Sequence, residues 1–175
     1  MSDASEISPN LKRMTAVLDV IALACRIITG IALVVLTVIF GWLVFGRYVL
    51  NATPTWVEQV ALLLVMLIAF LGAAVGVHEN THLSVSILRS SVPRRVRNVF
   101  VVITDVTMAV FGALMLWYGM QLTIFKWDSL IPLIQLPEGL RSLPLTVGGG
   151  LILLFSLGHL IRFFLGADER RDSIE

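Results

Sequence analysis

The chain has 175 residues, of which 57% are hydrophobic and only 14% are charged, and its mean hydropathy is +0.90. A soluble domain of this size could not bury so much apolar surface, so the composition excludes an ordinary water-soluble fold and predicts a membrane protein. The net charge of +1 gives no basis for nucleic-acid binding, and the single cysteine, Cys25, excludes an internal disulfide framework and a C-x-x-C redox centre.

Four long apolar runs predict an all-α membrane protein with four transmembrane helices in a single domain. A helix rises about 1.5 Å per residue, so roughly 20 residues cross a hydrocarbon core about 30 Å thick. We expect the helices at 17–47, 55–77, 98–125 and 142–165. The first begins near Thr15 and exceeds the core thickness, so it must tilt or start in the interface. We expect residues 1–13 to be flexible and residues 166–175 to form a polar tail.

The start of the second predicted helix carries a capping pattern. In Thr55-Trp56-Val57-Glu58, Thr55 caps the helix and Glu58 reaches back to the amide of the cap; Pro54 precedes them as a helix-start marker. Trp56 lies at the depth typical of an interfacial aromatic residue. A carboxylate at the membrane edge could instead bind a proton or cation, as in small multidrug exporters. We favour capping and subunit contact over ion coupling for Glu58.

Small residues and histidines mark the end of the second helix. Gly72 and Gly76 form a small-xxx-small face that lets two helices approach closely. The run His78-Glu79-Asn80-Thr81-His82 fits H-E-x-x-H, in which two histidines on one helix face bind zinc and the glutamate activates water.

The zinc interpretation also needs a third protein ligand. His159 is the best candidate, because Asp105 lies about 10 Å deeper in the membrane. Haem ligation by His78 or His82 with His159 is a further alternative, but such ligands usually lie inside a bundle rather than at its rim. We favour a polar helix exit followed by a turn, and we expect no metal and no cofactor.

Residues 82–92 predict a short helix lying in the membrane interface. Leu83, Ile87 and Leu88 have helical spacing, and several arginines nearby suit anionic lipid headgroups. The alternative is a positively charged loop that only sets topology, because Leu83, Val85 and Ile87 also alternate as in a strand.

The third helix holds Asp105, the only acidic residue well inside a predicted span. No basic residue lies deep in another span, so we expect Asp105 to hydrogen-bond a neighbouring helix or a partner subunit. In the following segment, Pro132, Pro137 and Pro144 forbid a long regular helix, and its apolar residues suggest a loop packed on another surface. Residues 148–150, three glycines, allow close helix approach or loosen the fourth helix.

The distribution of lysine and arginine predicts the orientation. With the N-terminus inside, ten of these residues lie on the inner side and three, Arg47, Lys126 and Arg141, on the outer side. Basic residues concentrate on the cytoplasmic side, so both termini and the 78–97 loop should be cytoplasmic. In a bacterium, residues 46–55 and 126–142 would face the periplasm.

Features of a substrate path are missing from the sequence. No span is interrupted by glycine or proline at mid-depth, and none carries a cluster of polar groups for a hydrophilic solute. This favours a subunit that supports transport over one that performs it.

Two ordered motifs resemble the DctQ-type small membrane subunit of tripartite ATP-independent periplasmic (TRAP) transporters. The stretch GRYVLNATPTWVEQVALLL is similar to the family's R-Y-x-x-N, short proline loop and W-x-E-E, with Gln59 in place of the second acid. The stretch FLGAAVGVHENTHLSVSIL is similar to F-L-G-A-A followed by G-H-I-x-V, with Thr81 where glycine is common and His78 where a basic residue is common. The matching residues are Arg47, Tyr48, Asn51, Trp56, Glu58, Gly72, Ala73, Ala74, His82 and Val85.

The resemblance implies a non-enzymatic subunit in a bacterial inner membrane. Its partners would be a large membrane subunit with a sodium-coupled path, a periplasmic binding protein that captures a solute such as an organic acid, and membrane lipids. The small subunit would scaffold the large one and help dock the binding protein. Interface or structural roles are expected for Arg47, Tyr48, Asn51, Trp56, Glu58, Gly72, Gly76, His82 and Asp105. The alternative is a self-sufficient small four-helix transporter that uses Glu58 or Asp105.

Overall fold

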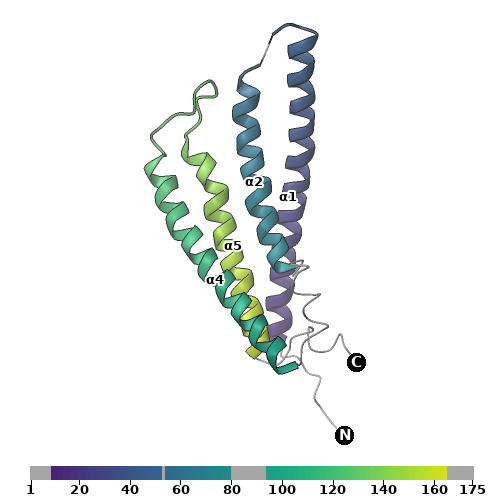
Figure 1. The fold of residues 1–175 in the computed structure, drawn as a ribbon, viewed down its shortest axis with the longest axis vertical. Coiled ribbons are helices and arrows are strands. Elements are labelled where there is room, and N and C mark those ends of the chain that lie inside the picture. Colours follow the sequence, from purple (N-terminus) through teal and green to yellow (C-terminus); the bar gives the residue numbers. More distant parts are fainter. Residues whose placement is uncertain (1–8, 53, 80–93, 165–175) are drawn as a thin grey trace.

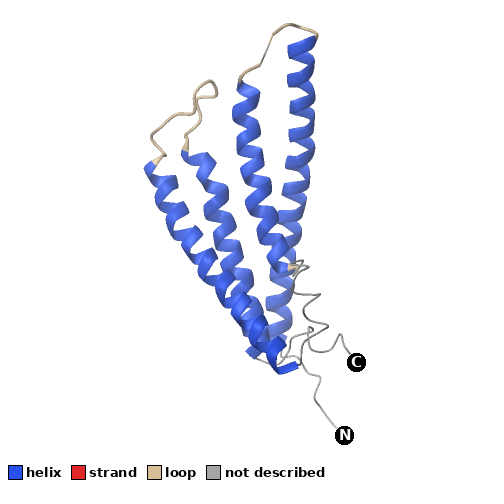
Figure 2. Cartoon of the chain, viewed as in Figure 1, coloured by secondary structure: helices blue, strands red, loops and turns tan. Residues whose placement is uncertain are grey.

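The computed structural model describes residues 9–52, 54–79 and 94–164, and these residues are almost entirely helical (Figures 1 and 2). The predicted interfacial helix at 82–92, the polar tail at 166–175 and His82 lie outside the described residues. The helices are α1 (Pro9–Tyr48), α2 (Trp56–His78), α4 (Arg94–Phe125) and α5 (Gly139–Phe164).

All four helices are long and apolar enough to cross a membrane, which confirms the predicted set of spans. The apolar stretches are Arg13–Tyr48, Trp56–His78, Val99–Phe125 and Gly139–Arg162. At about 1.5 Å per residue, the 40 residues of α1 extend for about 60 Å, twice the thickness of a hydrocarbon core. Part of α1 therefore lies outside the core or is tilted within it.

Two helix starts correct the sequence interpretation. The flexible segment predicted up to residue 13 is wrong in its second part, because α1 already begins at Pro9. Proline is favoured at a first helical position, and the leucine and basic residues that follow are good helix formers. Likewise α5 begins at Gly139 and includes Pro144, so that proline does not delimit the loop before it.

The helices form two arms that meet at one end of the bundle. The first arm pairs α1 with α2, the second pairs α4 with α5, and the main contact between the arms is that of α2 with α5. We call the end where the chain connects α1 to α2 and α4 to α5 the loop end, and the opposite end the terminal end. The arms diverge toward the loop end and converge toward the terminal end (Figure 1). In an 18-residue apolar stretch of each helix, 44% of the residues of α5 are buried, but only 6% of those of α1. Helix α5 is therefore central in the bundle, and α1 is peripheral.

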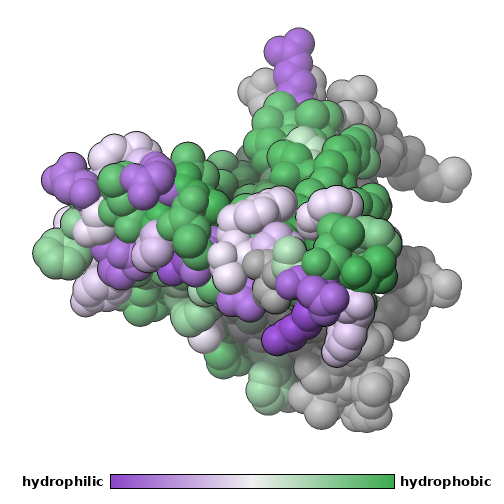
Figure 3. Space-filling view, turned by 90° about the horizontal axis from the view of Figure 1, so that it is seen from above, coloured by the Kyte–Doolittle hydropathy of each residue, from purple (hydrophilic) through white to green (hydrophobic). Residues whose placement is uncertain are grey.

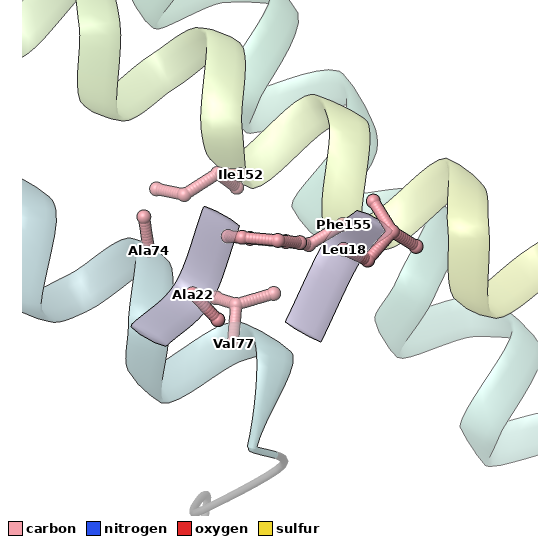
Figure 4. Close-up of a cluster of buried hydrophobic side chains, with 6 residues drawn as sticks. All are labelled: Leu18, Ala22, Ala74, Val77, Ile152 and Phe155. Atoms are coloured by element: carbon pink, nitrogen blue, oxygen red, sulfur yellow. The ribbon is translucent and has the colours of Figure 1, made fainter. Parts of the chain in front are cut away.

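A small apolar core joins the arms toward the terminal end (Figure 4). The fully buried ring of Phe155 on α5 lies at its centre. Around it pack residues of α1, α2 and α5, namely Leu18, Ala22, Ala74, Val77 and Ile152. A second buried cluster beside it consists of Cys25, Leu71 and Val75. One helix from the second arm is thereby fixed against both helices of the first.

Glycines let α5 approach both of its main neighbours. A Cβ on Gly149 would lie 2.7 Å from the backbone nitrogen of Leu116 on α4, and one on Gly112 would lie 2.7 Å from that of Leu153. On another face of α5, a Cβ on Gly148 would lie 2.8 Å from Cβ of Phe70 on α2. Such distances leave no room for a side chain. The glycines of α5 therefore allow close packing, the first of the two alternatives raised by the sequence.

Candidate functional site

The sequence-predicted residues separate into two groups at opposite ends of the bundle. Arg47, Tyr48, Asn51, Trp56 and Glu58 lie at the loop end and are exposed. Asp105 and the small-residue face of α2 lie toward the terminal end. The structure therefore does not bring Glu58 and Asp105 into one site.

Asn51 has a backbone reason for its position. Its φ is 49°, in the left-handed region where asparagine is tolerated better than most residues. The amide of Ala52 then donates to the carbonyl of Gly46 at 3.0 Å, which closes the end of α1. A Cβ on Gly46 would lie 3.0 Å from the oxygen of Ala52, so a small residue is needed there. The R-Y-x-x-N pattern thus encodes a helix stop and a tight return of the chain.

The predicted capping box at the start of α2 does not form. Thr55 already has helical backbone angles, φ −62° and ψ −22°, and its side chain makes no capping hydrogen bond. The amide of Val57 donates instead to the carbonyl of Pro54 at 3.1 Å. The turn therefore starts at Pro54, which takes Thr55 out of the extended conformation that a cap requires. Glu58 remains exposed at this end.

The connection between α4 and α5 is a closed loop. Backbone hydrogen bonds cross it from Ile131 to Leu136 at 2.7 Å and from Glu138 to Ser129 at 2.7 Å. Ile131 is fully buried beneath the loop. Four large apolar residues remain exposed on it: Trp127, Leu130, Leu133 and Leu136. Seen from the loop end, the surface mixes hydrophilic and hydrophobic patches (Figure 3).

Two polar contacts hold the loop end together. Nζ of Lys126 donates to Oε1 of Glu138 at 2.7 Å within the second arm. Arg141 donates to Oε1 of Gln59 and so joins the start of α5 to the start of α2. Between these contacts lies a cavity of about 200 Å³ whose walls include Met66 and parts of both arms. Gln59, which replaces an acid of the family motif, is therefore a contact between the arms.

We expect the stabilising effect of Glu138 to be lost in acid. The hydrogen bond from Lys126 lowers the pKa of Glu138 below its ordinary value of 4.5. The folded chain then holds this proton less tightly than the unfolded chain, so the stability from the pair is present above about pH 4.5 and lost as the pH falls through the folded-state pKa. In thermal unfolding, Glu138→Gln should lower the midpoint temperature at neutral pH. In acid, the midpoint temperatures of the variant and the wild type should become equal. Asp128→Asn, at an exposed position nearby, should leave the midpoint temperature unchanged. If Glu138→Gln still unfolds at a lower temperature than the wild type in acid, the Lys126–Glu138 pair is not the source of the difference.

At the terminal end, one polar residue from each helix forms a continuous chain across the bundle. Nε2 of His78 on α2 lies 2.9 Å from Oδ1 of Asp19 on α1. The ring of His78 stacks on that of His159 on α5, with centroids 6.0 Å apart. Nδ1 of His159 lies 4.0 Å from Oδ1 of Asp105 on α4. We call Asp19, His78, His159 and Asp105 the polar chain; both members of its Asp105–His159 pair are buried.

The polar chain brings Asp105 close to His159 on a neighbouring helix, whereas the sequence interpretation placed Asp105 about 10 Å deep in the membrane and away from the histidines. Asp105 lies in the half of α4 nearest the terminal end, and His159 lies in the corresponding half of α5. His78 also packs against the apolar core, because the centroid of its ring lies 4.7 Å from that of Phe155. The sequence shows two histidines and two aspartates near one predicted membrane face. It does not show which helices are neighbours, so the contacts among these four residues could not be predicted.

The geometry of the polar chain does not resemble a shared metal or haem site. Nε2 of His78 and Nδ1 of His159 lie within 4.0 Å of two different carboxylates, those of Asp19 and Asp105. Over the described ranges, no three residues of His, Cys, Asp and Glu are grouped so that they could hold a metal ion. His82, the second histidine of the zinc pattern, is outside those ranges.

Within the described residues, the small-residue face of α2 is open at Gly72. Gly72 is exposed, and a Cβ there would meet nothing within 4 Å. Gly76 is half-buried. A close approach at Gly72 therefore requires another molecule, while the close approaches within the chain involve Gly112, Gly148 and Gly149.

Comparison with known proteins identifies a consistent set of relatives. Residues 36–166 match the family described as tripartite ATP-independent periplasmic transporters, DctQ component. Over 128 residues the chain is 29% identical to a protein of Haemophilus influenzae named as a TRAP transporter small permease protein, covering 70% of this chain and 78% of that one. Over 122 residues it is 28% identical to the isethionate TRAP transporter permease protein DctMQ of Oleidesulfovibrio alaskensis, covering 67% of this chain but only 19% of that longer protein.

Proposed function

The chain belongs to the DctQ component of tripartite ATP-independent periplasmic transporters, and we propose that it is the scaffolding subunit of a sodium-coupled importer of organic acids or similar solutes. In this proposal it lies in the inner membrane of a bacterium with both termini in the cytoplasm. It binds the large membrane subunit along one flank and helps dock the periplasmic binding protein at its loop end.

Binding to a large membrane subunit is supported by the exposed face of α1. Only 6% of the residues in an 18-residue apolar stretch of this helix are buried, although it is the longest helix of the described chain. A stripe of large apolar residues at helical spacing stays uncovered in its outer half: Ile27, Ile31, Val34, Val38 and Phe45. The name DctMQ of the longer relative is consistent with a small and a large component joined in one chain. We propose that this stripe of α1 contacts the large subunit.

Docking of the binding protein is supported by the construction of the loop end. Both connections there are held by backbone hydrogen bonds, so they present exposed side chains from a fixed surface. Arg47, Glu58 and the apolar residues of the α4–α5 loop are all exposed on it. Charged groups around apolar ones steer and orient an encounter between two proteins.

The burial pattern of α1 carries the proposal, and co-purification tests it. When the chain is co-expressed with the large membrane protein encoded beside it, we expect affinity purification of one to retain the other. The paired change Val34→Trp and Val38→Trp should weaken retention, because it adds bulk to the proposed contact while it keeps the helix apolar. Val110→Trp, on an exposed position of α4, is the control and should retain the partner.

Two outcomes would contradict different parts of this proposal. A wild-type chain that purifies alone would overturn the subunit role. Equal retention by the α1 variant and the α4 control would overturn only the assignment of the α1 stripe.

A further inference from the structure

An apolar groove lies between α1 and α5 in the terminal half of the bundle. It has a volume of about 650 Å³. Its α1 wall includes Val17 and Ile21, and its α5 wall includes Gly150, Leu154, Leu157 and Ile161. Its one charged lining residue, Arg13, lies at the end of the groove nearest the start of α1. The groove exists because α1 packs mainly on α2 and touches α5 only near the apolar core.

The length of the groove distinguishes between two kinds of occupant. From Gly150 to Ile161 the groove follows α5 for about 17 Å, close to half of a hydrocarbon core about 30 Å thick. A transmembrane helix of a partner would need a groove that continues through both leaflets. A lipid tail reaches only from the membrane surface to the bilayer centre, which matches the span of this groove.

The charge at the mouth of the groove matches the same occupant. Arg13 is exposed, and no acidic residue of the described chain forms an ion pair with it. It follows Lys12 near the start of α1, just before the predominantly apolar residues from Met14 onward, and basic residues in such a position lie at the level of lipid headgroups. A guanidinium at this level suits a phosphate group, to which it can donate two parallel hydrogen bonds.

We propose that this groove binds a phospholipid of the leaflet at the terminal end, with one acyl chain along α5 and the phosphate on Arg13. The site depends on the chain spanning a membrane, and not on its proposed role in docking or sodium coupling. A lipid held there would fill the space between α1 and α5 that the apolar core leaves open, and so would fix the long α1 relative to the second arm.

Native mass spectrometry of the purified chain, and of its complex with the large subunit where the two co-purify, tests the site. The probes are dioleoylphosphatidylglycerol and dioleoylglycerol, which share both acyl chains but differ in the phosphate. We expect the wild-type protein to retain the phosphate-bearing lipid more strongly, and Val17→Trp, which fills the groove, to lose this binding. Arg13→Gln should weaken phosphatidylglycerol binding about fivefold, the effect of about 1 kcal/mol per basic residue at a membrane surface, and remove the preference between the probes.

Control variants and a crosslink distinguish a bound phospholipid from nonspecific lipid binding and from a protein occupant. Val110→Trp, an exposed change on α4 outside the groove, and Arg47→Gln at the loop end should bind both probes as wild type does. Equal binding by Val17→Trp and Val110→Trp would overturn the site, and a wild-type preference in Arg13→Gln would overturn the phosphate contact. With the photoreactive p-benzoylphenylalanine in place of Leu157, we expect crosslinks to phospholipid; crosslinks to the large subunit instead would identify a protein occupant and overturn the proposal.

Discussion

Replacing Gly149 by alanine should destabilise the bundle by about 1–3 kcal/mol, because the added methyl group cannot be accommodated. Its Cβ would lie 2.7 Å from the backbone nitrogen of Leu116 and 3.0 Å from the carbonyl oxygen of Gly112. Both atoms belong to the backbone of α4, so a side-chain rotation cannot relieve the contact. The helices must move apart, which weakens the packing along the second arm. Thermal unfolding of the purified chain in detergent, or retention of the large subunit, measures the effect.

Gly30 provides the matched control for this prediction. It also lies inside a helix, but a Cβ there meets nothing within 4 Å. Gly30→Ala should therefore not destabilise the chain, and the higher helix propensity of alanine should raise the unfolding free energy by up to about 1 kcal/mol. If the two variants unfold alike, the close approach of α4 and α5 does not contribute to stability as described.

Phe155→Ala is expected to cost about 3 kcal/mol, toward the lower end of the range for a buried aromatic residue. Phe155 is fully buried, and its ring packs against apolar residues from α1 and α2 as well as the ring of His78 (Figure 4). In a bilayer the alternative environment is lipid instead of water, so the cost comes from the cavity and the lost dispersion contacts. The change should loosen the joint between the arms and lower the unfolding midpoint.

Phe111→Ala on α4 serves as the control for Phe155. Phe111 is 55% exposed and faces away from the core of the chain. Its replacement should lower the midpoint much less than that of Phe155. An equal loss from both positions would show that the core between the arms is not the main support of the bundle.

The helices could be predicted from the sequence because hydrophobic length is a local property. Each run of apolar residues long enough to cross a membrane became a helix. The boundaries were less predictable where polar residues continue a helix into water. Residues 9–13 are polar or charged for the most part and were predicted as flexible, yet α1 begins at Pro9. Polarity indicates where the membrane ends, and a helix can extend beyond that point.

The contacts among the candidate residues could not be predicted in the same way. The pair of Asp105 and His159 and the pair of Asp19 and His78 each join different helices. Their partners depend on the placement of α5 between α2 and α4, which no local spacing encodes. Close packing at Gly149 was one of the two alternatives predicted for residues 148–150, but similar reasoning also selected Gly72, where an added Cβ meets nothing within 4 Å, and it did not select Gly112.

The two arms are joined near the terminal end and separate toward the loop end, so a rotation of one arm about this joint moves its far tip the most. The apolar core forms this joint, the polar chain lies close to it, and the loop end lies far from it. Along about 35 Å of α2, each degree of rotation at the joint displaces the far tip by about 0.6 Å. Within the described residues, the hydrogen bond from Arg141 to Gln59 links the arms at that tip, and the Lys126–Glu138 pair lies within the second arm. A rotation at the joint would therefore produce a larger displacement at the loop end than at the terminal end.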